Sequence, residues 1–337
     1  MRPSGIYDTN YVQAGAIFRT RVDWFWTIVI LVGLILLPQF SSLGSLGFSF
    51  VSSSFLALLT TGGILIIAIT GLNLLLGYTG QISLGQAAFM MVGAYTAAVL
   101  ARETEVPFII GLPIAALISG IVGLIFGLPS LRVKGFYLAM ATLAAQYIIP
   151  WAINNYNGSW FNLGKNQPMP LPRTSVLGFQ IENNMHEYYL VLVFLIITAA
   201  AARNLVRSRV GRAWISIRDN DLAAEQLGIN VFLYKVLAFF VCAVYAGIAG
   251  YLDAHISGSV SPDAYAPPSF APLYSIEMLA MLVIGGAGYP LGPTFGVVFY
   301  KFVDRYVVEF LNDIAVDYLP SILTTIDPEN IPVGMPN

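Results

Sequence analysis

Residues 52–101 read SSSFLALLTTGGILIIAITGLNLLLGYTGQISLGQAAFMMVGAYTAAVLA. They contain no Asp, Glu, Lys or Arg, and the charge-free stretch already begins at Trp24. A membrane-spanning helix needs about 20 apolar residues, so residues 24–101 have room for about three spans. Backbone groups in lipid must be paired within the protein, which permits helices or a closed barrel. Because the apolar residues run continuously instead of alternating with period two, the pattern predicts helices.

The composition of the whole chain agrees with this reading. Of 337 residues, 57% are hydrophobic and 10% are charged, whereas an ordinary soluble domain has about 25% charged residues. The 16 Lys and Arg face 18 Asp and Glu, which argues against a nucleic-acid binder. A single cysteine, Cys242, excludes an internal disulfide, and two histidines are too few for a common protein-only zinc site. The composition indicates an integral membrane protein.

Gaps between charged residues place the spans along the chain. We predict an all-α, polytopic membrane protein with about 8–10 transmembrane helices. The last two predicted segments are short, which suggests broken or partly buried helices. The predicted spans are residues 24–40, 52–76, 82–101, 107–128, 135–153, 188–202, 231–252, 273–287 and 292–303.

Basic residues set the expected orientation, because short cytoplasmic loops are enriched in Lys and Arg. Three basic groups fall on the same side when the spans are counted: Arg19 and Arg21; Arg132 and Lys134; and Arg203, Arg207, Arg209, Arg212 and Arg218. We take this side as cytoplasmic. Residues 1–23 then form a cytoplasmic N-terminal segment and residues 205–230 a cytoplasmic loop. Residues 154–187 and the Pro-rich residues 257–272 face outward.

The cytoplasmic loop carries the most information about function. Residues 206–230 read VRSRVGRAWISIRDNDLAAEQLGIN, with apolar residues at roughly helical spacing. Asp219 or Asn220 can cap a helix that starts near Asp221, and Gly228 can end it. Such a helix, with one apolar face and a charged rim, could dock into a groove of a partner. The alternative is a solvated connecting loop that only sets the orientation.

Polar residues inside the predicted spans are candidates for a transport pathway. The small residues of 80–94 let helices approach closely, and Gly77 and Gly80 can break a helix at membrane depth. Glu277 is the only acid within a predicted span, which makes it a functional candidate. The alternatives are a packing motif for residues 80–94, an aromatic belt for the tyrosines, and an interfacial helix-capping carboxylate for Glu277. The candidate pathway or gating residues are Asn73, Gln81, Ser83, Gln86, Tyr95 and Glu277.

Four stretches, in order, resemble one family. Ala223-Ala224-Glu225 followed by Gly228 resembles the coupling loop of bacterial ABC importer permeases. Gly211–Ala213 and Ile217–Asn220 are similar to the branched-chain amino acid permease family, in particular its M-type subunit. The other similar stretches are Gly71–Asn73 with residues 80–89 and 93–96; residues 127–129, 131–132, 135, 137–139 and 141–143; and residues 275–277, 284–288 and 291–293. The resemblance covers roughly residues 71–300.

This resemblance implies a division of labour between subunits. Residues 24–303 would form a permease domain built from inverted repeats, in the bacterial inner membrane. The pathway would be shared with an H-type permease, and a periplasmic binding protein would deliver a branched-chain or related amino acid. Two cytoplasmic ATPases would use ATP and Mg²⁺, while this chain binds no cofactor and is not an enzyme. The resemblance implies coupling roles for Arg212, Arg218, Asp219, Glu225 and Gly228.

The sequence departs from the family in two places. The outer loop lacks the Thr-Gly-Gly type motif of many members, so an amide or urea stays open as the substrate. Residues 304–337 read as an amphipathic C-terminal segment in place of the family's last helix, so we expect a truncated or shortened member.

Two other classes of protein are alternatives to a permease. A membrane-embedded enzyme would need a nucleophile–base set or a metal site, which the spans do not provide. An ion-coupled secondary transporter of small polar or amphipathic solutes would use Glu277 as its ion site.

Overall fold

The computed structural model describes residues 21–42, 53–104, 106–130, 136–155, 169–172, 175–176, 179–181, 183–261 and 270–308. Residues 1–20, most of 154–187 and residues 309–337 lie outside this part of the chain, as do Arg19, Arg132 and Lys134. The predictions about the two terminal segments and about the outer loop therefore stay predictions.

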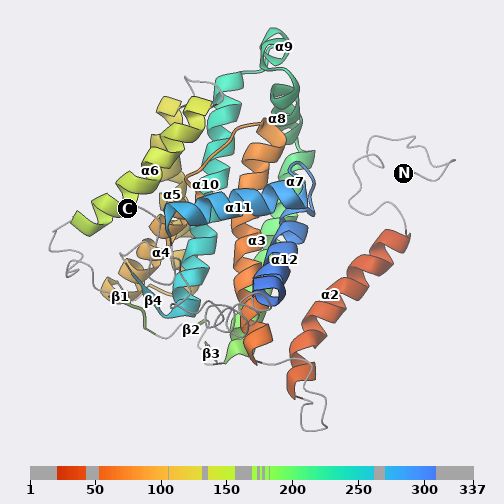
Figure 1. Cartoon of the computed structure of the whole chain (residues 1–337), viewed down its shortest axis with the longest axis vertical. Coiled ribbons are helices and arrows are strands. Elements are labelled where there is room, and N and C mark those ends of the chain that lie inside the picture. The colour runs from red at the N-terminus through yellow and green to blue at the C-terminus, as the bar shows by residue number, and fades with distance from the viewer. Residues whose placement is uncertain are drawn as a thin grey trace, which may run out of the picture.

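Helices dominate the described residues, which confirms the all-α prediction (Figure 1). The helices are α2 (Arg21–Ser42), α3 (Ser53–Thr79), α4 (Gln86–Glu103), α5 (Phe108–Ser130), α6 (Phe136–Asn155), α7 (Asn184–Arg207), α8 (Arg209–Asp219), α9 (Asp221–Gln226), α10 (Val231–Ser257), α11 (Pro272–Gly285) and α12 (Gly292–Phe302). A π-helical turn, Val303–Val308, continues α12. Two antiparallel pairs, β1 (Met169–Pro170) with β4 (Ser259–Val260) and β2 (Ser175–Val176) with β3 (Phe179–Gln180), lie at the end opposite α9.

Each predicted span falls on a helix of the structure. Among the described residues, four helices are long and apolar enough to cross a membrane: Ser54–Thr79, Phe108–Leu128, Asn184–Arg207 and Val231–Ser257. Tyr137–Ile153 and Pro272–Gly285 are shorter apolar helices. The chain is therefore a polytopic membrane protein, while the number of crossings and the inverted repeat stay predictions. α7 extends beyond its charge gap because long Arg side chains can keep their charged heads at the membrane surface.

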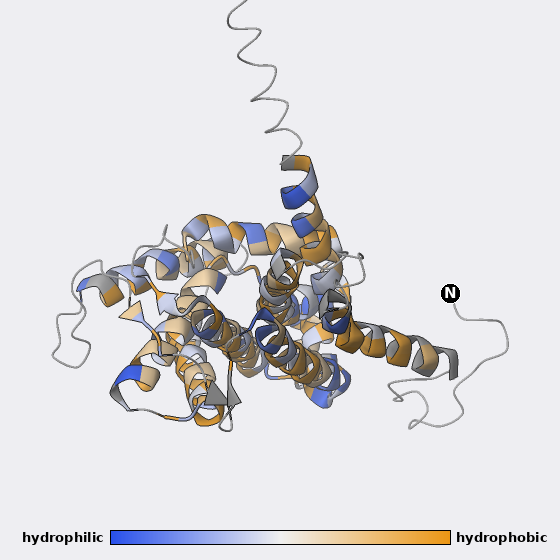
Figure 2. Cartoon of the chain, turned by 90° about the horizontal axis from the view of Figure 1, so that it is seen from below, coloured by the Kyte–Doolittle hydropathy of each residue, from blue (hydrophilic) through white to orange (hydrophobic). Residues whose placement is uncertain are grey.

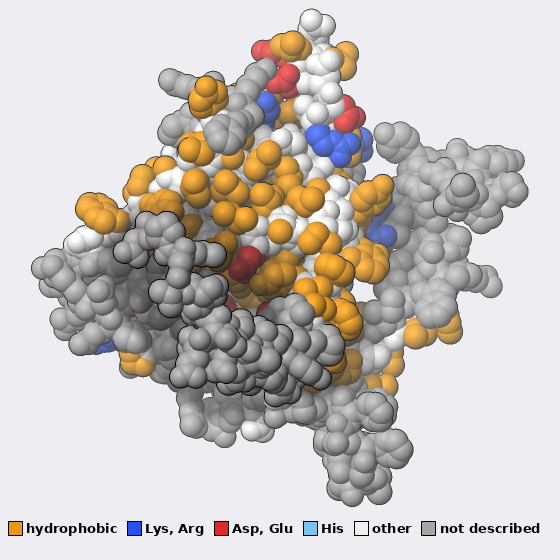
Figure 3. Space-filling view, viewed as in Figure 1, with side chains coloured by type: hydrophobic (Ala, Val, Ile, Leu, Met, Phe, Trp, Pro, Cys, Tyr) orange, Lys and Arg blue, Asp and Glu red, His pale blue; other side chains and the backbone are white. Residues whose placement is uncertain are grey.

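The surface of the bundle fits this reading. Ile110, Leu117 and Ile125 on α5 are each more than half exposed, as expected for side chains that face lipid or another membrane protein. Figure 2 shows hydrophobic residues along most of the length of the helices. Figure 3 shows basic and acidic side chains at the end that carries α8 and α9, and mainly hydrophobic side chains, with a few acidic atoms, over the middle.

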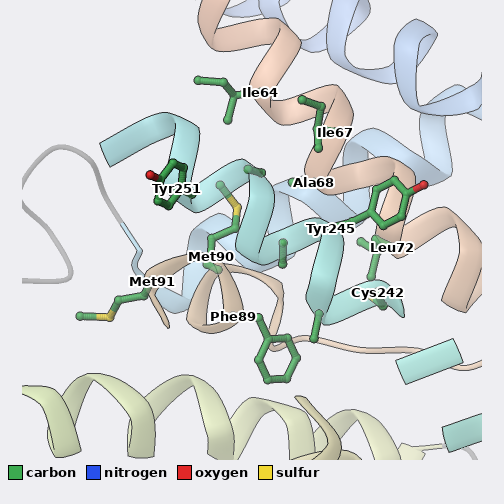
Figure 4. Close-up of a cluster of buried hydrophobic side chains, with 14 of the residues drawn as sticks. Ile64, Ile67, Ala68, Leu72, Phe89, Met90, Met91, Cys242, Tyr245 and Tyr251 are labelled. Atoms are coloured by element: carbon green, nitrogen blue, oxygen red, sulfur yellow. The ribbon is translucent and has the colours of Figure 1, made fainter. Parts of the chain in front are cut away.

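α10 lies at the centre of the bundle and packs on α3, α4 and α5. A Cβ on Gly93 of α4 would overlap the backbone of Gly247, and one on Gly250 of α10 would overlap the Met90 carbonyl oxygen. Without side chains at these positions, the two backbones touch directly. Figure 4 shows side chains of α3, α4 and α10, including Met90, around this contact.

α2 stands beside the bundle and is held by two adjacent tyrosines of α7 (Figure 1). Pro38 has no N–H, so the carbonyl of Leu34, four residues earlier, has no helical donor. Tyr188 donates its hydroxyl to this carbonyl at 3.0 Å, and Tyr189 donates to the carbonyl of Ile35 at 2.9 Å. The proline in α2 thus creates the acceptor through which α7 binds it.

α11 lies across the bundle, and α12 then runs along α3 (Figure 1). Between them, Gly286 and Gly288 adopt φ angles of 98° and 86°, a region that glycine enters at little cost. Gly292 of α12 packs so closely on Gly286 that a Cβ there would overlap the Gly286 carbonyl oxygen. The glycines of this segment therefore make the tight turn from α11 into α12.

Candidate functional site

The connection between α7 and α10 contains two capped helices. Ser208 accepts from the N–H of Val210 at 3.1 Å at the start of α8. Asn220 accepts from the N–H groups of Leu222 and Ala223, both at 3.1 Å, at the start of α9. Gly228, with φ of 82°, follows α9 and donates its N–H to the backbone carbonyl of Glu225 at 2.9 Å. The predicted helix from Asp221 to Gly228 is confirmed, and Asn220 instead of Asp219 is its cap.

The sequence analysis did not predict where α8 begins and ends. The pattern that indicates this helix is the spacing of the apolar residues Trp214 and Ile217, which are 0% and 3% exposed. The indole N–H of Trp214 donates to the carbonyl of Tyr234 in α10 at 2.9 Å. This buried side chain fixes α8 to the start of α10.

A second contact fixes α8 to the end of α3. The Arg218 guanidinium donates through Nη1 to the carbonyl of Gly77 at 2.9 Å. Gly77 lies in the last turn of α3, where helical carbonyls lack donors and carry partial negative charge. Gly80 follows with φ of 70° and donates its N–H to the backbone carbonyl of Leu76 at 3.0 Å. Helix α3 ends immediately before this residue. The predicted helix break occurs at Gly80, whereas the predicted break at Gly77 is wrong because Gly77 is still helical.

The turn between α11 and α12 meets the same end of α3. Asn73 donates through Nδ2 to the carbonyl of Tyr289 at 2.9 Å and accepts from the N–H of Gly288 at 2.8 Å. A Cβ on Gly77 would overlap both the Asn73 side chain and the Gly288 backbone. We call Asn73, Gly77, Gly80, Arg218 and Gly288 the junction. It brings two sequence candidates, Asn73 and Arg218, into one site that the sequence did not predict.

Beyond the junction, α9 projects from the bundle (Figure 1). Leu222 and Leu227 are 62% and 80% exposed, and Glu225 is exposed beside them. Asp221 pairs with Lys235 of α10 at 3.5 Å, which ties α9 to the bundle. Of the other predicted coupling residues, Arg212 and Asp219 are also exposed, and Asp219 pairs with Arg218 at 3.1 Å. An ordered tip with exposed leucines and an acid is suited to binding a protein partner.

The start of α4 forms a buried polar site deep in the bundle. Gln86, 0% exposed, donates to the carbonyl of Ala68 at 2.8 Å, and the thiol of Cys242 donates to its Oε1 at 3.1 Å. Ala68 and Cys242 lie near the middles of α3 and α10. The predicted span from residue 82 is therefore wrong at its start, since residues 80–85 return to this depth as non-helical backbone.

Side chains of α6 and α11 bind the backbone at this helix start. The N–H of Leu84 donates to Thr142, that of Ala87 to Ser275, and that of Ala88 to Gln146, each at 2.9 Å. Gln146 also accepts from the Ser275 hydroxyl at 3.0 Å. Ser83 is buried, and its hydroxyl accepts from the N–H of Gly85 at 3.4 Å. The sequence analysis missed Gln146, whose signal was a lone amide in an apolar helix.

The remaining candidates do not join one site. Gln81 and Tyr95 are 5% and 4% exposed, and within the described residues their side-chain polar atoms have no hydrogen-bond partner. Glu277 of α11 is partly buried and accepts from the Tyr300 hydroxyl of α12 at 3.3 Å. Tyr274 interacts electrostatically with Glu277 and with Asp253 of α10, so Glu277 belongs to a separate polar region.

Comparison with known proteins matches the sequence of this chain to one family. A sequence model of the family described as "Branched-chain amino acid transport system / permease component" matches residues 54–325. The chain belongs to this family. The matched range includes α3, the junction and both helices α8 and α9, and it extends beyond the predicted residues 71–300. No solved structure matches this permease.

Curated relatives are permease proteins of three transport systems. The permease is 31% identical to the high-affinity branched-chain amino acid permease LivM of Salmonella typhimurium, over 65% of its own length and 55% of the relative. It is 24% identical to the ribose import permease RbsC of Escherichia coli, over 85% of its own length and 83% of the relative. It is 25% identical to the autoinducer 2 import permease LsrC of Enterobacter, over 85% of its own length and 78% of the relative. The chain thus spans about half the length of the LivM relative that it matches.

Proposed function

We propose that this permease is the membrane subunit of an ATP-driven importer in the bacterial inner membrane. In this proposal it forms the pathway with an H-type permease, receives substrate from a periplasmic binding protein, and is moved by two cytoplasmic ATPases. The ATPases use ATP and Mg²⁺, and this chain couples their motion to the pathway. The family match over residues 54–325 and the likeness to import permeases support this function.

The single observation that carries the coupling role is the projecting α9. In the proposal, the exposed Leu222 and Leu227 enter a groove of an ATPase, and Glu225 binds a basic group at its rim. Arg212 and Asp219 are exposed on α8, which precedes this surface, and Gly228 fixes where α9 ends. The ties of Trp214 and Asp221 to α10 support this role, because a loosely held loop would absorb a displacement instead of passing it on.

The substrate is proposed to be a branched-chain or related amino acid. The 31% identity to LivM over 65% of the chain, compared with 24% to RbsC and 25% to LsrC of Enterobacter, supports this choice. We propose Gln81 and Tyr95 as pathway residues, since their polar atoms have no partner within the described residues. Asn73, Ser83 and Gln86 are more simply explained as structural, because their side chains hydrogen-bond within the chain. An ion-coupled transporter that uses Glu277 is the second candidate, supported by its partly buried pair with Tyr300.

Purification from mild detergent tests the proposed function. We expect the wild-type chain to bring down an ATPase and the Glu225→Arg variant to lose it, because the reversed charge repels a basic partner group. Asp304→Arg makes the same charge reversal at an exposed position after α12 and is expected to retain the ATPase. A wild-type chain that purifies without any ATPase would favour the ion-coupled transporter instead.

A further inference from the structure

Arg218 directs its Nη1 toward the end of α3, while its side chain stays 40% exposed. Its Nη1 lies 2.9 Å from the carbonyl oxygen of Gly77, and its Nε and Nη2 lie 3.2 and 3.1 Å from one oxygen of Asp219. The guanidinium therefore uses three of its nitrogens inside this chain. Three of its five N–H groups are thus engaged within the chain, and two remain.

Two glycines pack closely against the Arg218 side chain. A Cβ on Gly80 would lie 3.3 Å from Cγ of Arg218, and one on Gly288 would lie 3.3 Å from Nη1. Gly77 packs on Gly288 without room for a methyl group. The end of α3 and the α11–α12 turn therefore both lie close to the Arg218 side chain, and they also pack on each other. Close packing of this kind transmits a displacement.

The junction is also the place where distant parts of the chain meet. Asn73 fixes the α11–α12 turn to α3 through two hydrogen bonds, across 215 and 216 residues. α12 runs along α3, and α11 reaches α4 and α6. A shift of α8 that moves the end of α3 must consequently move the α11–α12 turn with it.

We propose that Arg218 is a positioning residue that transmits the displacement of α8 to α3 and to the α11–α12 turn, and that it is not a contact for the ATPase. This inference rests on the proposed function. Arginine suits the task because its planar group presents several donors in fixed directions, so one side chain holds Gly77 and Asp219 together. A lysine can hold one of these acceptors but cannot reproduce both with the same geometry.

The test uses the complex that purifies with the wild-type chain, reconstituted in lipid vesicles. For Arg218→Gln we expect the ATPase subunits to purify within about twofold of the wild-type amount and to hydrolyse ATP. Uptake per ATP hydrolysed should fall about tenfold, which is within the usual range of coupling between two sites. Arg218→Lys should lie between Gln and wild type. Arg209→Gln removes the same charge from the exposed first turn of α8 and should behave as wild type.

The ratio of uptake to hydrolysis separates this role from a structural one, because a misfolded fraction lowers both activities together. Loss of the ATPases from Arg218→Gln would overturn the inference and leave the proposed function intact. An unchanged ratio in both Arg218 variants would also overturn it. If the glutamine variant fails to fold, the ratio measured for Arg218→Lys decides. A wild-type chain without ATPases would overturn the inference and the proposed function together.

Discussion

Replacing Gly250 with leucine is expected to leave almost no folded protein in the membrane. A Cβ at this position would overlap the carbonyl oxygen of Met90, which belongs to the backbone of α4 and cannot rotate away. Ordinary overpacking costs about 1–3 kcal/mol because neighbouring side chains can adjust. Here α4 and α10 must separate, and the neighbouring contact between Gly93 and Gly247 is lost with them. We therefore expect a larger cost than ordinary overpacking.

Size-exclusion chromatography of membrane extracts, followed by thermal unfolding, measures this effect. Gly33→Leu is the matched control, because in the described part of the chain no atom beyond the adjacent backbone of α2 itself lies within 4 Å of a Cβ placed on Gly33. This control should elute and unfold as the wild type does. A Gly250→Leu protein with wild-type yield and melting temperature would show that α4 and α10 are not in direct backbone contact.

Replacing Trp214 with alanine is expected to release α8 and α9 from the bundle and to abolish transport. The indole is 0% exposed and donates to the carbonyl of Tyr234. Removing a buried tryptophan costs about 3–5 kcal/mol. Because α8 lies at the end of the bundle, the loss falls on the connection between α7 and α10, while the contacts of α10 with α3, α4 and α5 remain.

Hydrogen exchange in detergent locates the change along the chain. Amides of residues 208–230 should exchange much faster in Trp214→Ala, and those of residues 239–254 should keep their protection. Trp151→Ala on α6 removes an indole that is 66% exposed, so its exchange should match that of the wild type. Faster exchange throughout the chain would mean that Trp214 stabilises the whole fold.

The sequence predicts some of the helices and helix ends of this fold better than others. Charge-free stretches predicted each span, because a lipid-facing helix must be apolar along most of its length. The start of α10 at residue 231 was predicted to the residue, since Asn230 ends the polar loop. The start of α4 was placed four residues early. Thr142, Gln146 and Ser275 bind the backbone there, and these partners come from helices far away in the sequence.

The same limit applies to the candidate site. Helix α9 was predictable from its own residues, because a cap and a glycine end are local signals. The junction was not, since Asn73 and Gly288 are joined only when α11 and α12 pack against α3. Arg218 was singled out by family resemblance as a coupling residue, but its partner Gly77 lies 141 residues away. Its local sequence gives no sign that the side chain turns inward.

The central claim is that this permease belongs to an ATP-driven importer. The most direct test is to measure which source of energy drives uptake into vesicles. Vesicles would contain the purified complex and trapped ATP, with the binding protein and radiolabelled branched-chain amino acids outside. A parallel sample would replace ATP with an imposed proton or sodium gradient. We predict uptake with ATP and none with a gradient alone. Uptake driven by a gradient in the absence of ATP would contradict the claim and assign the chain to ion-coupled transport.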